Sequence, residues 1–324
     1  MSNTTEKTSN SLPLIKKEHR NKVLITLFLV TALAGGGYWA VVAATSSSAP
    51  PVALALRLAY IAVLYMPVPL YTLLLSRFML GIPIPFRALL SLKHITVKKY
   101  ALVAGLFLAW AVLMIGSVAI LGWLWPEMFG HLATTNEHLV YNLEKLIGTS
   151  VDTSAMNMPP TPLAMLPLGI FGALMAGLTV NAIFAMAEEI MWRGYLAQAF
   201  AGRPFCKKYV TIGVLWGLWH IPLIALGYNY GTANALPGSV LFIGFCVVMS
   251  LVLGFVVERT RSVWLAAVLH GTFNGFSQVM LLLVVGGSSL LASSAVGVIS
   301  LVAWLVVFVG CYIRTTFASV TERA

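Results

Sequence analysis

Charged residues are scarce in this chain. They make up 9% of its 324 residues, whereas a soluble globular domain carries roughly 25%. Hydrophobic residues account for 59%. This composition excludes a soluble globular protein and predicts an all-α membrane protein that crosses the bilayer several times.

Cysteine is almost absent as well. Cys206, Cys246 and Cys311 are the only three, and their spacing offers neither a C-x-x-C pair nor a disulfide framework. Lysine and arginine outnumber acidic residues by 20 to 10, but they are spread over short loops. This distribution argues against a nucleic-acid partner and is typical of residues that orient a protein in a bilayer.

Eight apolar segments are long enough to cross about 30 Å of hydrocarbon. The fourth is too long for one perpendicular span, so we expect it to tilt or to extend beyond the bilayer. The first resembles a signal peptide in its basic start, but its apolar core is longer than the usual one. The expected spans are 23–44, 53–76, 100–125, 163–199, 209–227, 238–257, 262–284 and 289–312.

Basic residues predict the orientation of these spans. With the N-terminus in the cytoplasm, 17 of the 20 lysines and arginines fall in cytoplasmic segments, and only Lys145 lies on the opposite side. The positive-inside rule therefore predicts eight transmembrane helices in the cell membrane, with both termini cytoplasmic. Arg57 and Arg193 fall within spans. Arg57 has no obvious partner, and we expect it to snorkel or to face a cavity.

The chain divides into four expected parts. A short amphipathic helix is expected around His138 to Ile147, within the one sizeable loop. The parts are a disordered cytoplasmic arm (1–22), three N-terminal helices with an extracytoplasmic loop at 126–162 (23–160), four catalytic helices (163–284), and a last helix with a short cytoplasmic tail (285–324).

Two adjacent carboxylates, Glu188 and Glu189, stand inside the fourth apolar segment with Arg193 close behind. One charged side chain at the bilayer centre costs at least about 2.5–3.5 kcal/mol. Such a pair therefore favours a functional site over packing. The alternative is a salt bridge within the helix, and it suits Glu189 and Arg193 better than Glu188.

Two histidines out of six, His220 and His270, lie within spans, and Asn274 shares a helix face with His270. With 1.5 Å of rise per residue, Glu188, His220 and His270 lie ~22, ~18 and ~14 Å from the cytoplasmic boundary. Three helices thus bring polar groups to a similar depth, which predicts one shared site. Taken singly, each histidine could be a packing residue, and Asn274 an interhelical clamp.

These groups suit the addition of water to a carbonyl. Two carboxylates in contact do not both ionise readily, and Arg193 stabilises the charge of one, so a general base is available. A neutral histidine can hold a water molecule, while a second histidine and an amide can stabilise an oxyanion. Hydrolysis of a peptide bond is the reaction that this set predicts.

The same groups could instead bind a divalent metal such as zinc, because two histidines and one glutamate form a frequent catalytic zinc shell. The candidate ligands are Glu188, His220 and His270, although the soluble signature H-E-x-x-H is absent. Aromatic residues surround the motifs, either as core packing or as the wall of a substrate pocket. The candidate wall residues are Trp192, Trp216 and Phe273.

Three motifs in order resemble the CPBP family of intramembrane proteases, which includes the type II CAAX prenyl endopeptidases and bacterial relatives linked to bacteriocin processing and immunity. They lie within residues 163–284. Trp216 departs from the phenylalanine that is common in the family. The motifs are Glu188-Glu189-x-x-x-Arg193, Trp216-x-x-x-His220 and His270-x-x-x-Asn274.

The resemblance implies a role for each motif residue. Glu188 would activate water and His220 would help to position it. His270 and Asn274 would stabilise the oxyanion. Glu189 and Arg193 would organise the site. The family is often described as metal-dependent, but the motifs alone do not assign the metal a role.

We therefore expect a membrane-embedded endopeptidase that acts near the cytoplasmic side on a peptide or membrane protein, with or without a lipid modification. A transporter coupled to protons or ions is a second class, because buried carboxylates and histidines also form relays. Against it, the chain has no repeated halves and no second span with a carboxylate. A non-catalytic immunity or scaffold protein is the third.

Overall fold

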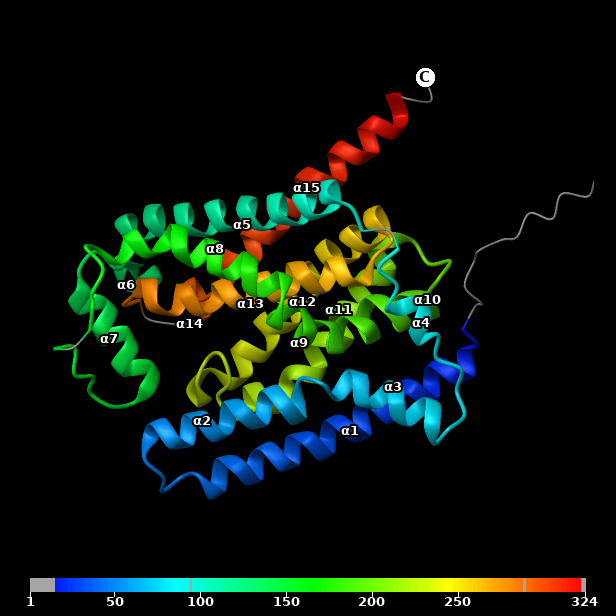
Figure 1. Ribbon diagram of the computed structural model, residues 1–324, viewed down its shortest axis with the longest axis horizontal. Coiled ribbons are helices and arrows are strands. Elements are labelled where there is room, and N and C mark those ends of the chain that lie inside the picture. The colour runs from blue at the N-terminus through cyan, green and yellow to red at the C-terminus, as the bar shows by residue number, and fades with distance from the viewer. Residues whose placement is uncertain (1–14, 94, 155, 288–289, 322–324) are drawn as a thin grey trace, which may run out of the picture.

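The computed structural model describes residues 15–93, 95–154, 156–287 and 290–321 (Figure 1). The first fourteen residues of the predicted N-terminal arm and the last three of the tail lie outside these ranges. The described chain is mostly helical, which confirms the all-α part of the expected fold class. Two short strands, β1 (His131–Leu132) and β2 (Val284–Val285), pair antiparallel.

Seven helical segments in the described ranges are long and apolar enough to cross a membrane, and a bent pair can provide an eighth. The expected number of spans is therefore reached only if that pair counts as one. The single segments are α1 (Lys17–Ala44), α2–η1–α3 (Pro50–Phe78), α5 (Val97–Leu124), α11 (Phe205–Ala225), η4–α12 (Thr232–Thr260), α13 (Val263–Leu283) and α14–α15 (Leu290–Arg314).

Within these segments and between them lie shorter elements. The second segment is interrupted by a π-helical turn, and one loop holds an amphipathic helix close to the predicted position. These elements are α2 (Pro50–Tyr60), η1 (Ile61–Tyr65), α3 (Val68–Phe78), α4 (Phe86–Leu89), α6 (Pro126–Phe129), α7 (Asn136–Ile147), η2 (Pro162–Ala164), η4 (Thr232–Asn234), α12 (Ala235–Thr260), α14 (Leu290–Ser293) and α15 (Val298–Thr321).

The fourth expected span is broken in two. Helix α8 (Met165–Leu178) and the helical run that starts with α9 (Val180–Glu189) are bent by 55°. The fourth segment, which we expect to tilt or to extend beyond the bilayer, is instead broken into two helices. Next to the bend, α8 approaches α13 closely, because a Cβ at Gly177 would lie 2.7 Å from the Cα of Thr272. Both halves pack against α13.

Two further expectations are corrected. Helix α1 begins at Lys17, so the last residues of the predicted disordered arm (1–22) are helical. Arg57, for which the sequence offers no obvious partner, has two: its Nε donates to the Thr45 hydroxyl at 3.0 Å, and its Nη2 donates to the Val42 carbonyl at 3.3 Å. Arg57 thus satisfies the end of α1, where backbone carbonyls lack helical partners.

The helices that carry the motifs lie in the middle of the molecule. In Figure 1, α1, α2 and α3 lie together along the lower edge, α5 and α8 lie along the upper edge, and α9 and α11 lie between them. After α9 the chain forms a π-helix, η3 (Ile190–Leu196), and a last turn, α10 (Ala197–Ala199). The π-helix packs against α3, α11, α12 and α13, so it lies at the centre of the bundle.

Helices α11 and α12 approach each other closely at two glycines. A Cβ at Gly213 would lie 2.5 Å from the Cα of Val247, and one at Gly217 would lie 2.6 Å from the Cα of Ile243. Both neighbours are backbone atoms, which cannot move aside as a flexible side chain can. Small residues at i,i+4 are the usual means by which membrane helices pack this tightly.

Gly217→Ala is therefore expected to destabilise the protein. The added methyl group must push α12 away from α11, and overpacking of this kind costs about 1–3 kcal/mol. Unfolding in a detergent titration measures the change. Gly105→Ala on α5 is the control, because a Cβ there meets nothing within 4 Å. Equal stability of the two variants would contradict the close approach.

Candidate active site

Glu188 lies in the last turn of α9 and is 4% exposed. Its Oε2 accepts a hydrogen bond from the indole Nε1 of Trp216 on α11 at 2.9 Å. Its Oε1 has no hydrogen-bond partner among the described residues. One oxygen is therefore held in place across two helices, while the other remains available for a proton.

Glu189 is fully buried and joins two other polar groups. Its Oε1 accepts from Arg193 Nη1 at 2.9 Å and from His270 Nδ1 at 3.0 Å. The predicted pairing of Glu189 with Arg193 is confirmed. The contact with His270, which lies on α13, extends this pair to a second helix.

The structure also defines the hydrogen-bonding state of His220, which is 5% exposed on α11. Its Nδ1 lies 3.0 Å from the backbone carbonyl of Trp216. A carbonyl oxygen can only accept, so Nδ1 carries the hydrogen. In the neutral ring, Nε2 then presents a lone pair that can accept a hydrogen bond from water.

Trp216 lies next to the other polar groups of the cluster. Its ring lies 5.3 Å from the His270 ring, 6.0 Å from the His220 ring and 4.3 Å from the Arg193 guanidinium carbon. From the sequence, this residue was considered as packing or as a pocket wall, and its hydrogen bond to Glu188 was missed. The signal was that a buried indole N–H needs an acceptor.

Asn274 lies one turn beyond His270 on α13, but its side chain is exposed and is not part of the buried cluster. It makes no hydrogen bond to another residue in the part of the chain that the structure describes. Phe273 packs among Trp110, Phe245 and Trp304, and Trp192 packs against Trp219. These two aromatics therefore occupy packing positions.

The buried side chains fit a three-ligand metal centre only in part. The Nδ1 atoms of His220 and His270 are engaged, with a backbone carbonyl and with Glu189, which leaves Nε2 of each ring as the nitrogen that could bind a metal. Within the described ranges, however, no three or more His, Cys, Asp or Glu side chains are grouped to hold a metal ion. Glu188, His220 and His270 are therefore not arranged as a zinc shell in this structure, and we assign no step to a metal.

The helical turn that carries His220 is tied to the N-terminal helices. Tyr65, at the end of η1, donates its phenolic hydrogen to the Trp219 carbonyl at 2.7 Å, and the two rings lie 5.5 Å apart. Pro222 lies inside α11 just beyond this point and lacks the N–H that would continue the helical hydrogen bonds. Tyr65 therefore stabilises α11 next to its proline.

Tyr65→Phe is expected to lower the free energy of unfolding by about 1 kcal/mol, because hydrogen bonds between membrane helices contribute on this scale. If the bond also helps to orient His220, the rate of peptide cleavage should fall by the factor that corresponds to the same free energy. Tyr71→Phe is the control, since among the described residues its phenol bonds to the Val63 carbonyl eight positions earlier and to no other helix. Identical stability of the two variants would show that the Tyr65 bond contributes nothing.

A tyrosine that the motifs did not point to also lies near the site. Tyr228 belongs to the turn after α11, where Gly227 (φ 96°), Asn229 (φ 68°) and Gly231 (φ 75°) adopt left-handed backbone conformations. Burial, with a smaller contribution from the charge of Glu188, raises the pKa of Tyr228 to about 12. Its phenol therefore keeps its hydrogen at neutral pH.

Comparison with known proteins supports the resemblance seen in the motifs. Residues 163–276 match the type II CAAX prenyl endopeptidase Rce1-like family. The CAAX prenyl protease 2 of Methanococcus maripaludis is 28% identical over 95 residues, which are 28% of this chain and 35% of that protein. The match thus covers well under half the length of this relative.

The matched segment runs from η2 into α13 and contains all three motifs together with the bend between α8 and α9. The buried polar cluster accordingly lies within the segment, residues 163–276, that is similar to the type II CAAX prenyl endopeptidase Rce1-like family.

Proposed function

We propose that this protein is an intramembrane endopeptidase in which Glu188 activates the water that attacks a peptide bond. The observation that supports the proposal is the hydrogen bonding of the Glu188 carboxylate. Trp216 holds its Oε2, while its Oε1 has no partner among the described residues. His220, on the same helix as Trp216, presents a lone pair on Nε2 to a second hydrogen of that water.

The hydrolysis proceeds in two steps. Glu188 removes a proton from water as the water oxygen bonds to the carbonyl carbon, and the carbonyl π electrons move to its oxygen. The C–N bond then breaks as the oxyanion collapses, and Glu188 delivers its proton to the departing nitrogen. The products are a carboxylic acid and an amine, and Glu188 returns to its starting state.

Donors on α13 would stabilise the oxyanion. With Nδ1 bonded to Glu189, His270 donates from Nε2 when its ring is protonated. Asn274, one turn further along, offers its amide to a substrate that enters from the exposed side of α13. Glu189 and Arg193 act as positioning residues, because they fix His270 and pack against Trp216.

We further propose that the reaction takes place near the cytoplasmic side of the cell membrane. The distribution of basic residues along the sequence supports this orientation. The substrate class is a peptide or membrane protein. The name of the curated relative makes a prenylated peptide with a C-terminal CAAX motif the first substrate to test.

The test uses purified protein in proteoliposomes, with such a peptide in its prenylated and unmodified forms and a digest of labelled membrane proteins. Wild-type protein should release new amino termini from at least one substrate, and His220→Gln should lose most of this activity. Proton or sodium flux without cleavage would favour a transporter instead. Neither activity with wild-type protein would favour a non-catalytic scaffold.

A further inference from the structure

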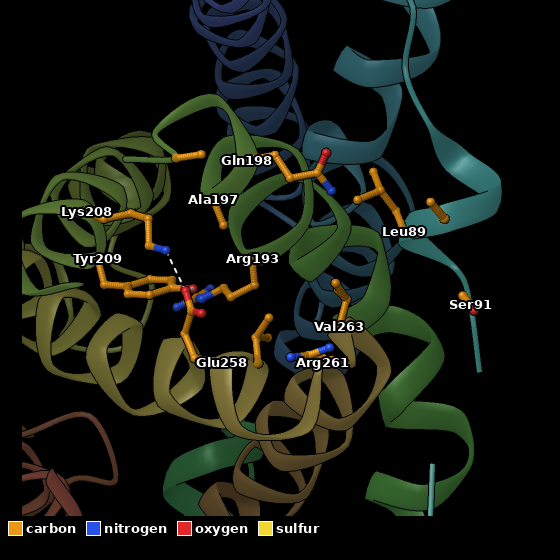
Figure 2. Close-up of a pocket in the computed structure, with 13 residues that line it drawn as sticks. Leu89, Ser91, Arg193, Ala197, Gln198, Lys208, Tyr209, Glu258, Arg261 and Val263 are labelled. Atoms are coloured by element: carbon orange, nitrogen blue, oxygen red, sulfur yellow. Dashed lines mark hydrogen bonds and ion pairs between the residues drawn. The ribbon is translucent and has the colours of Figure 1, made fainter. Parts of the chain in front are cut away.

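A pocket of about 420 Å³ lies beside the polar cluster, at one end of the bundle (Figure 2). Its walls come from η3 and α10, the beginning of α11, the end of α12, the first residue of α13 and the segment around α4. The polar residues relevant to its chemistry are Arg193, Gln198, Lys208, Glu258 and Arg261. Of the residues given a role in catalysis above, Arg193 alone lines this pocket, and its bond to Glu189 uses only Nη1.

Arg193 gives the pocket a buried donor. The residue is 1% exposed, and only its Nη1 is bonded, to Glu189. Its Nε and Nη2 are buried without a hydrogen-bond partner among the described residues. Buried N–H groups normally have acceptors, and leaving them unpaired is costly. An anionic oxygen that enters this pocket would supply the missing acceptor.

The charges in the pocket also favour an anion. Lys208 forms an ion pair with Glu258, and the Tyr209 hydroxyl donates to the same carboxylate oxygen (Figure 2). The single acidic group is therefore already neutralised. Arg261 is exposed and forms no ion pair with any residue that the structure describes. The mouth of the pocket thus carries an uncompensated positive charge.

The position of the pocket indicates where the anion comes from. Lys208 lies at the start of the membrane-spanning helix Phe205–Ala225, and Glu258 lies at the end of Thr232–Thr260. Arg261 follows directly, and the next span begins at Val263. Residues at the ends of three spans lie at the level of the lipid headgroups. Basic pockets between helices at this level are typical binding sites for headgroups.

We propose that this pocket binds the phosphate of an anionic phospholipid, with Arg261 at the mouth and the free N–H groups of Arg193 inside. Leu89 and Val263 provide apolar surface for the start of the acyl chains of the lipid. Inorganic phosphate carries the same anionic group as the lipid, so it is the alternative ligand for this pocket. The proposal concerns binding alone, so its success or failure is independent of the proposed protease activity.

The experiment measures thermal stabilisation of the full chain in a neutral detergent by dihexanoyl phosphatidylglycerol. Dihexanoyl phosphatidylcholine and inorganic phosphate are the comparison ligands. Arg261→Asn removes the charge and preserves the backbone, because asparagine adopts the left-handed conformation (φ 57°) of this position readily. Arg259→Gln removes a neighbouring exposed charge that does not line the pocket and serves as the matched control.

Phosphatidylglycerol should bind to the wild type and to Arg259→Gln with the same affinity. Its affinity for Arg261→Asn should be about fivefold weaker, the effect expected of one charge at a membrane surface. Phosphatidylcholine should bind more weakly than phosphatidylglycerol. Three results would each overturn the proposal: equal binding of the two lipids, equal affinity of wild type and Arg261→Asn, or inorganic phosphate binding as tightly as phosphatidylglycerol.

Discussion

Glu188→Gln should reduce kcat/KM for peptide cleavage by roughly 10²–10⁴-fold, the range in which a general base contributes. Glutamine keeps an oxygen that can accept the hydrogen bond from Trp216, which Glu188 now accepts at 2.9 Å. The local structure should therefore survive the change. An amide cannot take the proton from water, so the chemical step should fail even though the substrate still binds.

The appropriate control for this variant is Glu127→Gln, which removes an exposed carboxylate from the short helix α6. It should cleave at the wild-type rate. Both variants should unfold at the same detergent concentration as the wild type. A Glu188→Gln protein that retains cleavage within tenfold of wild type would assign the general base to another residue.

Arg193→Met should destabilise the protein by about 3–5 kcal/mol, because it leaves the Glu189 carboxylate buried without its guanidinium. Both side chains of this ion pair are completely inaccessible, so solvent cannot compensate for the lost partner. The guanidinium also stacks on the Trp216 ring at 4.3 Å, a contact that methionine replaces only in part. The free energy of unfolding in a detergent titration is the measurement.

A second substitution makes this prediction specific. Glu189→Gln combined with Arg193→Met removes both charges and leaves an amide oxygen to accept from His270, which lies 3.0 Å from Glu189. The double variant should recover most of the lost stability, because replacing a whole buried ion pair by neutral groups is often nearly neutral. If the double variant is as unstable as Arg193→Met, packing rather than the buried charge accounts for the loss.

The spans could be predicted well because hydropathy along the chain determines them. The first apolar segment was expected at 23–44, and helix α1 occupies Lys17–Ala44. The bend between α8 and α9 could not be predicted in this way. The backbones of α8, α9 and α13 approach closely beside it at Gly177 and Gly271, and such contacts leave no periodic signal in the sequence.

For the candidate site, too, some features could be predicted from the sequence and others could not. The rise per residue was enough to place Glu188, His220 and His270 at a similar depth, and the structure buries all three around Trp216. The depth of a residue in the membrane does not determine how its helix is rotated about its own axis. The indole hydrogen bond to Glu188 therefore went unnoticed, and the exposure of Asn274 was not foreseen. The catalytic roles of these residues stay predictions.

The π-helix that follows the glutamate pair determines where this segment can lose a residue. A π-helical turn over Ile190–Leu196 accommodates more residues per turn than an α-helix does. Deleting one residue there would let the segment relax into a regular helix, and the residues on either side would still face the same neighbours. The same deletion within Val180–Glu189, which is α-helical, would instead rotate the two sides of the deletion by about 100° relative to each other.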